Sequence, residues 1–153
     1  MMMVTHGAIG ALIGEQTASA GLAFILGLVS HYFLDIIPHG DDDSVETFKT
    51  ESNFRKVLGA IMMDSVLGII FLLLYFTNTT KSGVELWPVV AGIAGAVIPD
   101  LLVGFYYVNK KYFFRHNFFH LKIHDLIKVH VPFRVAFAVQ IVVIILLWNF
   151  YKF

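Results

Sequence analysis

The sequence predicts an all-α fold, a polytopic membrane bundle of about four spanning helices, and two observations carry this prediction. Hydrophobic residues make up 58% of the 153 residues and charged residues only 14%, and the mean hydropathy is +0.75. Soluble domains contain about 45–50% apolar and about 25% charged residues. In addition, four segments each supply the roughly 20 mostly apolar residues that a transmembrane helix needs. These segments are Ala18–Ile37, Lys56–Phe76, Leu86–Val108 and Phe133–Tyr151.

Shorter elements complete the expected architecture of a single domain, residues 1–153. Thr5–Gly14 is expected to form a helix too short to cross a bilayer, and Asn117–His130 an amphipathic helix at the interface. In the polar loop after the first span, Asp43 and Glu46 have the spacing of a capping box. The glycines of the spans are interpreted as sites of close helix packing; they include Gly59, Gly68, Gly92, Gly95 and Gly104.

The charges predict how the bundle is oriented. The stretch 39–56 holds three lysines and arginines and the stretch 108–134 holds six, so nine of the eleven basic residues lie on one side. The positive-inside rule makes that side cytoplasmic, as in a prokaryotic plasma membrane. The N-terminus lacks the basic region of a signal peptide and is expected to belong to the mature fold.

Ionisable side chains gather near the basic side of three predicted spans. His31 and Asp35 are four residues apart on one helix face, while Asp64 and Asp100 each lie about eight residues inside their spans. All are within roughly 12 Å of the same face, given the helical rise. Buried carboxylates cost several kcal/mol unless they are paired or bind a metal. A divalent cation would offset this cost and the repulsion between the acids.

Histidines on other segments extend the predicted site. The run "RHNFFHLKIHDL" places His116, His120 and His124 on one face of the interfacial helix. His6 begins the first short helix, and His39 follows Pro38 at the end of the first span. Histidine and aspartate suit zinc, with manganese or iron as alternatives, and the set suffices for two or three ions. The predicted ligands are His6, His31, Asp35, His39, Asp64, Asp100, His116, His120 and His124.

Each of these residues also has a plainer interpretation. Asp64 alone could be a hydrogen-bond partner between helices. The three histidines could be the polar face of a surface helix, and His6 could cap the first helix. The joint occurrence of these features on one side of the membrane favours the metal site. The absence of cysteine excludes disulfides and thiolate ligands, and the zero net charge argues against a nucleic-acid partner.

Four stretches resemble the motifs of the small membrane-bound metal-dependent hydrolases, which are regarded as distant relatives of zinc-dependent phospholipase C and the zinc single-strand nucleases. The stretches are "THGAIGALIG", "GLVSHYFLDIIPHGD", "AGAVIPDLL" and "RHNFFH", and the resemblance covers most of the chain except its last span. It implies metal ligation by His6, His31, Asp35, Asp100 and His120. The chain departs from the family where "PDLLVG" lacks a second acid and a histidine, and the candidates to replace them are His39 and Asp64.

The expected activity is hydrolysis of a phosphoester bond by metal-activated water. Asp35 or Asp64 would act as the catalytic carboxylate that orients the water or takes its proton. Lys110, Lys111 and Arg115 lie where lipid phosphates would sit, so the expected partners are membrane lipid and a lipid or lipid-linked substrate. Two alternatives remain open at this point: a transporter of protons or divalent cations, and a non-catalytic protein with a structural metal.

Overall fold

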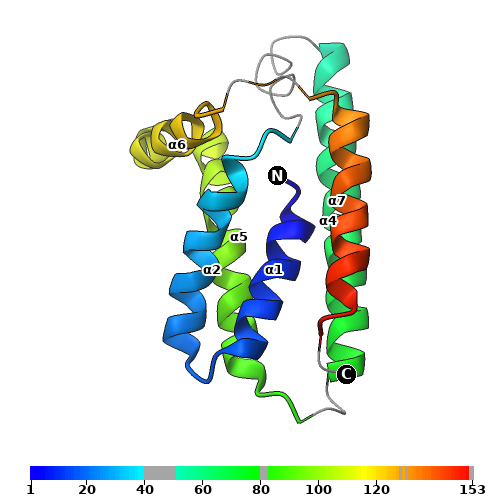
Figure 1. Cartoon of the computed structure of the whole chain (residues 1–153). Coiled ribbons are helices and arrows are strands. Elements are labelled where there is room, and N and C mark those ends of the chain that lie inside the picture. The colour runs from blue at the N-terminus through cyan, green and yellow to red at the C-terminus, as the bar shows by residue number, and fades with distance from the viewer. Residues whose placement is uncertain (40–50, 80–82, 128, 130, 152–153) are drawn as a thin grey trace.

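The computed structural model describes residues 1–39, 51–79, 83–127, 129 and 131–151, and in these ranges it contains helices and no strand. The prediction of an all-α fold is therefore confirmed. Helix α1 lies in the middle, with α2 and α5 on one side and α4 and α7 on the other, while α6 lies across one end (Figure 1). The helices are α1 (Met3–Gln16), α2 (Ala20–Asp35), α4 (Glu51–Thr79), α5 (Leu86–Val108), α6 (Lys110–His124) and α7 (Phe133–Trp148).

Two of the four expected spans are long and apolar enough to cross a membrane. They are Met62–Thr79 of α4 and Leu86–Tyr106 of α5, with mean hydropathies of 1.5 and 1.9. Helices α2 and α7 are apolar but have 16 residues each, which is about 24 Å of helix against a hydrocarbon core of about 30 Å. Helix α2 begins after Ser19, whose side chain caps its first turn by accepting from Leu22 N at 3.4 Å, and it ends at Asp35.

The predicted bounds of the interfacial helix were wrong. The helix begins at Lys110 because the side chain of Asn109 accepts a hydrogen bond from the backbone N–H of Lys111 at 3.2 Å. It ends at His124, where the N–H of Asp125 turns back to the Leu121 carbonyl. This shift keeps all three predicted histidines inside the helix. The predicted capping box of Asp43 and Glu46 lies outside the described residues.

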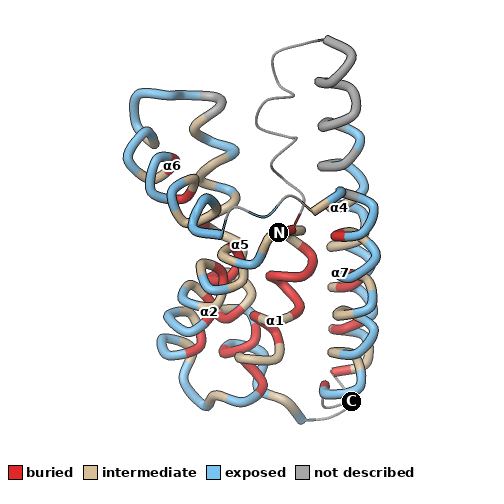
Figure 2. The backbone as a smooth tube through the Cα atoms, turned by 45° about the horizontal axis from the view of Figure 1, so that its top comes forward, coloured by how far each residue is buried: buried red, intermediate tan, exposed pale blue. Residues whose placement is uncertain are grey.

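Helix α1 lies at the centre of the bundle, although the sequence predicted only that this helix is too short to cross a bilayer. Nine of its fourteen residues are buried, and Figure 2 shows this concentration of buried residues along α1, with exposed residues on the outer sides of the other helices. Helix α1 contacts α2, α4, α5 and α7. Its short side chains, such as Ala8 and Ala11, are both 0% exposed and let these neighbours approach from two sides.

Glycines make the contact between α5 and its neighbours possible. A Cβ atom on Gly92 would collide with the carbonyl oxygen of Gly10 in α1, and one on Gly95 would collide with that of Phe24 in α2. Such close backbone approach is typical of small residues in membrane helices. The same interpretation was wrong for three other glycines, because a Cβ atom there would meet open space: Gly59, Gly68 and Gly104.

The substitution Gly92→Ala is therefore expected to destabilise the protein by about 1–3 kcal/mol, the usual cost of overpacking. Gly68→Ala is the matched control, and it should be neutral or stabilising by up to about 1 kcal/mol, since alanine favours a helix. Thermal unfolding in detergent micelles measures both. Equal melting temperatures for the two variants would contradict the packing described here.

Aromatic side chains hold α4 and α7 against α1. The rings of Phe71 and Trp148 have centroids 6.1 Å apart. Two tyrosines add hydrogen bonds: the hydroxyl of Tyr151 donates to the Ala8 carbonyl at 2.7 Å, and that of Tyr75 donates to Glu15 at 2.6 Å. These contacts lie at the end of the bundle away from α6 and leave the other end of α1 to the ionisable residues.

Candidate metal centre

The ionisable residues converge where the N-terminal half of α1 meets the last turn of α2, the middle of α5 and the end of α6. Asp35, the last residue of α2, is fully buried at the centre of this cluster. Its Oδ1 lies 3.1 Å from His6 Nε2. Its Oδ2 lies 3.0 Å from His31 Nε2 and 3.0 Å from His124 Nε2. One carboxylate therefore faces imidazoles from three helices.

Asp100 and His120 close the cluster from α5 and α6. Asp100 Oδ1 lies 3.8 Å from His31 Nε2 and 3.7 Å from His120 Nε2. His120 is itself 3.6 Å from Asp35 Oδ2. The Asp100 side chain is 21% exposed, whereas that of Asp35 is 0% exposed. Asp100 is thus the carboxylate of the pair that solvent can reach.

The described residues contain two groups of side chains that can hold a metal ion. The first consists of His31, Asp35, Asp100 and His120, and the second of Asp35, His39 and His124; within each group the ligand atoms lie within 4.8 Å of one another. Asp35 belongs to both groups, and a carboxylate has two oxygens with which to bridge two cations. The positively charged Met1 amino group contacts two members of the second group, at 2.9 Å from Asp35 Oδ1 and 2.5 Å from His39 Nε2.

His31 provides the test of whether this donor set fits a metal. Its Nδ1 lies 2.8 Å from the Ala96 carbonyl oxygen, which can only accept, so Nδ1 carries the hydrogen. In the neutral ring, Nε2 then presents a lone pair toward Asp35 Oδ2, and these two buried atoms form no hydrogen bond although they are 3.0 Å apart. Two acceptor atoms 3.0 Å apart can share a cation, either a proton or a metal ion. The residues therefore fit a metal ion.

A backbone carbonyl also orients the ring of His39, as the Ala96 carbonyl orients that of His31. His39 Nδ1 lies 2.6 Å from the Ile37 carbonyl, so Nε2 is the atom that can bind a metal, and it lies 2.5 Å from the Met1 amino nitrogen. Metal-binding histidines usually direct their other nitrogen to such an acceptor. Burial lowers the pKa of His120 to about 3, so its ring is neutral at pH 7, the form in which imidazole binds metals.

Two predicted ligands have other partners. Both carboxylate oxygens of Asp64 accept from the start of α1, from Met3 N at 2.7 Å and Val4 N at 3.1 Å. His116 Nε2 lies 3.0 Å from the Pro99 carbonyl, so it contacts α5 beside the cluster. The structure brings the other predicted residues together: His6, His31, Asp35, His39, Asp100, His120 and His124. His6 contacts Asp35 and lies 4.0 Å from Asp100 Oδ2, but it belongs to neither group of converging atoms.

Asp64 thus performs the task of an N-cap from a neighbouring helix. We expect Asp64→Ala to lower the free energy of unfolding by about 0.5–2 kcal/mol, the usual cost of losing a cap, while the metal content stays at the wild-type value. Asp64→Asn keeps one acceptor oxygen and should retain most of the stability. Thermal unfolding and elemental analysis of the same samples check both expectations, and loss of metal in Asp64→Asn would contradict them.

Two contributors to the site were missed at the level of sequence. Gln140 of α7 is 5% exposed, and its Oε1 accepts from Met2 N at 2.7 Å and Thr5 Oγ1 at 3.3 Å. A single amide in the apolar run "FRVAFAVQIVVIILLW" was the available signal, since isolated polar residues in such helices usually have a partner. The Ala96 carbonyl could not be predicted from the sequence, because every residue has a backbone carbonyl. It lies in the turn from which Pro99 removes a helical hydrogen bond.

Comparisons of the chain with protein-family models, with curated proteins and with solved structures find no match. The function is therefore argued from the geometry and chemistry of the cluster. Its donors are imidazole nitrogens and carboxylate oxygens, a set that suits zinc, iron and manganese.

Proposed function

We propose that the protein is a membrane-bound, metal-dependent hydrolase of phosphoester bonds in a lipid or lipid-linked substrate, as its sequence resemblance implies. The observation that carries the proposal is the convergence of His31, Asp35, Asp100 and His120, with His31 Nε2 and Asp35 Oδ2 facing each other without a hydrogen bond. Asp35 is shared with His39 and His124, which supports a site for two ions. Paired metals are common in phosphoester hydrolysis.

The outer surface of the bundle supports placement in a membrane. Large apolar side chains on the outside of α2, α4, α5 and α7 are more than half exposed, and soluble monomers rarely expose contiguous apolar patches of more than a few hundred Å². Together with the two helices long enough to cross, this surface favours an integral membrane protein. The basic residues near the cluster favour a cytoplasmic site. Examples of these exposed side chains are Ile25, Phe33, Leu73, Trp87 and Ile145.

Each residue of the cluster has a distinct role in the proposed reaction. Divalent ions held by His31, Asp35, Asp100, His120, His39 and His124 would supply Lewis acidity, both to activate water and to neutralise phosphate oxygens. Asp35 is fully buried and orients the imidazoles around it. Asp100, being partly exposed, is the carboxylate placed to accept the proton of the attacking water. Asp100 therefore replaces Asp35 and Asp64, the residues predicted from the sequence for this role.

Helix α6 supplies positive charge beside the cluster. Lys110, Lys111 and Arg115 are exposed on it, as are the aromatic rings of Phe114 and Phe118. Basic and aromatic side chains on one helix are typical of a helix in the headgroup layer. Such a helix would attract an anionic headgroup toward the metal ligands at its other end.

Transport of protons or cations is less well supported. Helix α1 runs from His6 in the cluster to Glu15 near the other end of the bundle. The eight residues between them, Gly7–Gly14, are all glycine or apolar. Proton relays use chains of ionisable side chains, and α1 offers none between its two ends.

Hydrolysis by the purified protein tests the proposal. Metal-loaded protein is assayed with a water-soluble phosphomonoester, a phosphodiester and a phospholipid in mixed micelles. We expect turnover of at least one class, and Asp100→Asn should lower it by about 10²–10⁴, the usual contribution of a general base. Asp125→Asn is the matched control, because Asp125 is an exposed acid just beyond α6, and it should retain wild-type turnover.

Two results would overturn the proposal: no cleavage of any substrate by protein that contains metal, or equal turnover in Asp100→Asn and wild type. Metal flux into liposomes that disappears in Asp100→Asn, without hydrolysis, would establish the transporter instead.

A further inference from the structure

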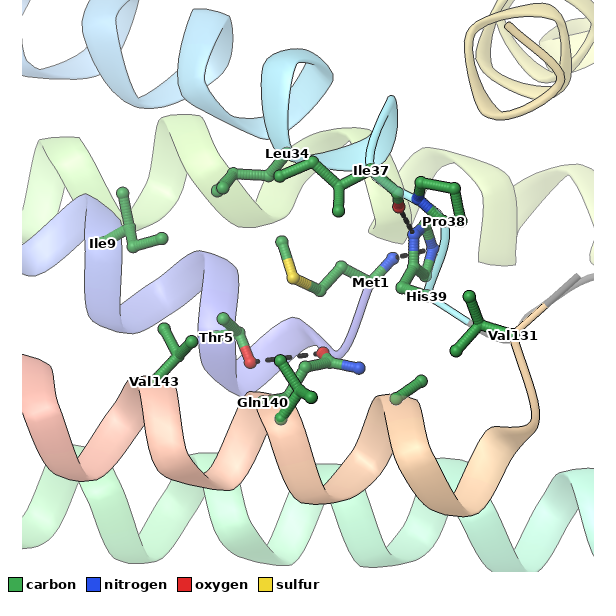
Figure 3. A pocket seen from close by; sticks show the side chains of 12 residues that line it. Met1, Thr5, Ile9, Leu34, Ile37, Pro38, His39, Val131, Gln140 and Val143 are labelled. Atoms are coloured by element: carbon green, nitrogen blue, oxygen red, sulfur yellow. Dashed lines mark hydrogen bonds between the residues drawn. The ribbon is translucent and has the colours of Figure 1, made fainter. Parts of the chain in front are cut away.

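An apolar cavity adjoins the metal centre. It has a volume of about 160 Å³ and lies between the end of α2 and helix α7, with α1 along its side (Figure 3). Its walls are largely aliphatic and come from these three helices, from Met1 before α1 and from the segments after α2 and before α7. The aliphatic lining residues are Ile9, Leu34, Ile37, Val131, Ala136, Val139 and Val143.

The cavity is continuous with the metal ligands through His39. His39 lines the cavity and also belongs to the ligand group of Asp35 and His124. A molecule that contacts the second ligand group can thus extend directly into the apolar space. In a bound lipid, only a few bonds would therefore separate a reacting headgroup at the ligands from a hydrocarbon chain in the cavity.

One amide group lies in this apolar wall. The Oε1 of Gln140 accepts from Met2 N and Thr5 Oγ1, while the amide nitrogen points away from Thr5 in Figure 3. That nitrogen carries two donor hydrogens. The other polar lining residues are Met1, Thr5 and His39. A largely aliphatic cavity with the Gln140 amide in its wall fits a ligand that is a hydrocarbon with a carbonyl acceptor near its polar end.

Two side chains that line the cavity also belong to the outer surface of the protein. Ile37 and Val139 line the cavity and are 55% and 56% exposed. Both belong to the apolar outer surface that would face lipid. A chain can consequently enter from the hydrocarbon region without passing through water, which favours a lipid over a soluble ligand.

We infer that this cavity binds the ester-linked acyl chain of a lipid whose phosphate lies at the metal centre, with Gln140 donating to the ester carbonyl. The inference rests on the proposed function and names its substrate class, an acylated phospholipid. A cavity of about 150 Å³ with aliphatic walls can hold a benzene-sized group, so this one takes the first part of the chain. The rest extends past Ile37 and Val139 into the bilayer.

Photo-crosslinking tests the cavity without requiring hydrolysis. The probe is phosphatidic acid with a diazirine near the carbonyl end of one acyl chain, in phosphatidylcholine vesicles that contain the full chain with its metal. Adducts are expected on peptides that contain Ile9, Leu34 or Val143. Val143→Phe fills the cavity and should reduce these adducts about tenfold, since the affinity of two buried methylene groups corresponds to that factor.

The control variant is Val142→Phe, which changes the neighbouring side chain, 53% exposed and outside the cavity lining. It should leave the adducts unchanged, and both variants should keep wild-type metal content as evidence of folding.

Equal labelling of outward residues such as Ile145, unchanged by Val143→Phe, would overturn the acyl-chain site. If the water-soluble phosphoester is still cleaved in that case, the proposed hydrolase stands without this cavity. Cavity labelling without hydrolysis of any ester would instead overturn the proposed function and the substrate role of the lipid.

Discussion

Replacement of Asp35 by asparagine is expected to remove metal from both ligand groups at once. Asp35 is shared between the two groups, and its carboxylate faces three imidazoles at 3.0 to 3.1 Å. Asparagine preserves the shape but removes the negative charge that offsets the charge of a cation in a site with little access to water. Loss of a residue that only orients a ligand lowers metal affinity about 10–100-fold, and loss of a shared ligand should exceed that range.

The matched variant is His124→Ala, because His124 belongs to the second group only. Elemental analysis of protein purified without chelator should find about two equivalents of metal in the wild type, as expected for paired-metal sites. The His124→Ala variant should keep the ion of the first group alone, and Asp35→Asn should contain none. Wild-type metal content in Asp35→Asn would contradict the assignment of Asp35 as the bridging ligand.

Removal of the metal by a chelator is expected to destabilise the whole bundle. The ligands come from α2, α5 and α6, and from the segment that follows α2, so one cation connects elements distant in the sequence. Without it, the Asp35 and Asp100 carboxylates face each other across His31 Nε2, at 3.0 Å and 3.8 Å from it. Like charges in a buried site repel each other.

A ligand present at 100 times its Kd stabilises the native state by about 2.7 kcal/mol. For a chain of this length, 1 kcal/mol shifts the melting temperature by about 2–4 °C, so the chelator should lower it by about 5–10 °C. Fluorescence-monitored melting in detergent measures the shift, and readdition of zinc or manganese should restore the original value. In Asp35→Asn the chelator should have no effect. A wild-type melting temperature that does not respond to the chelator would show that the cluster holds no ion.

The periodicity of the sequence predicted much of the candidate site. His31 and Asp35 are one turn apart in an apolar segment, and such a pair lies on one helix face wherever the helix is placed. The same spacing predicted a stripe of His116, His120 and His124. The cost of ionisable groups in an apolar protein then pointed to a shared partner for them.

The packing of the helices decided which of these residues meet. Helix α6 crosses the end of the bundle (Figure 1), so the last two histidines of its stripe reach Asp35, while His116 lies beside Pro99. Asp64 lies at the depth expected for a ligand, yet the N-terminus of α1 occupies both of its oxygens. Sequence periodicity gives the face of a helix but not the position of a short neighbouring helix against it.

By itself, the sequence determined the helical class, because apolar runs of about 20 residues have few other stable forms. It also predicted a cluster of buried histidines and aspartates without cysteine, and such a cluster can hold a metal ion. Only the tertiary structure decided that α1 lies at the centre of the bundle and that Asp35 is shared by two ligand groups. The reason is physical: the contacts at Gly10, Gly92 and Gly95 depend on backbone approach between helices far apart in the chain, and no local pattern of residues encodes that distance.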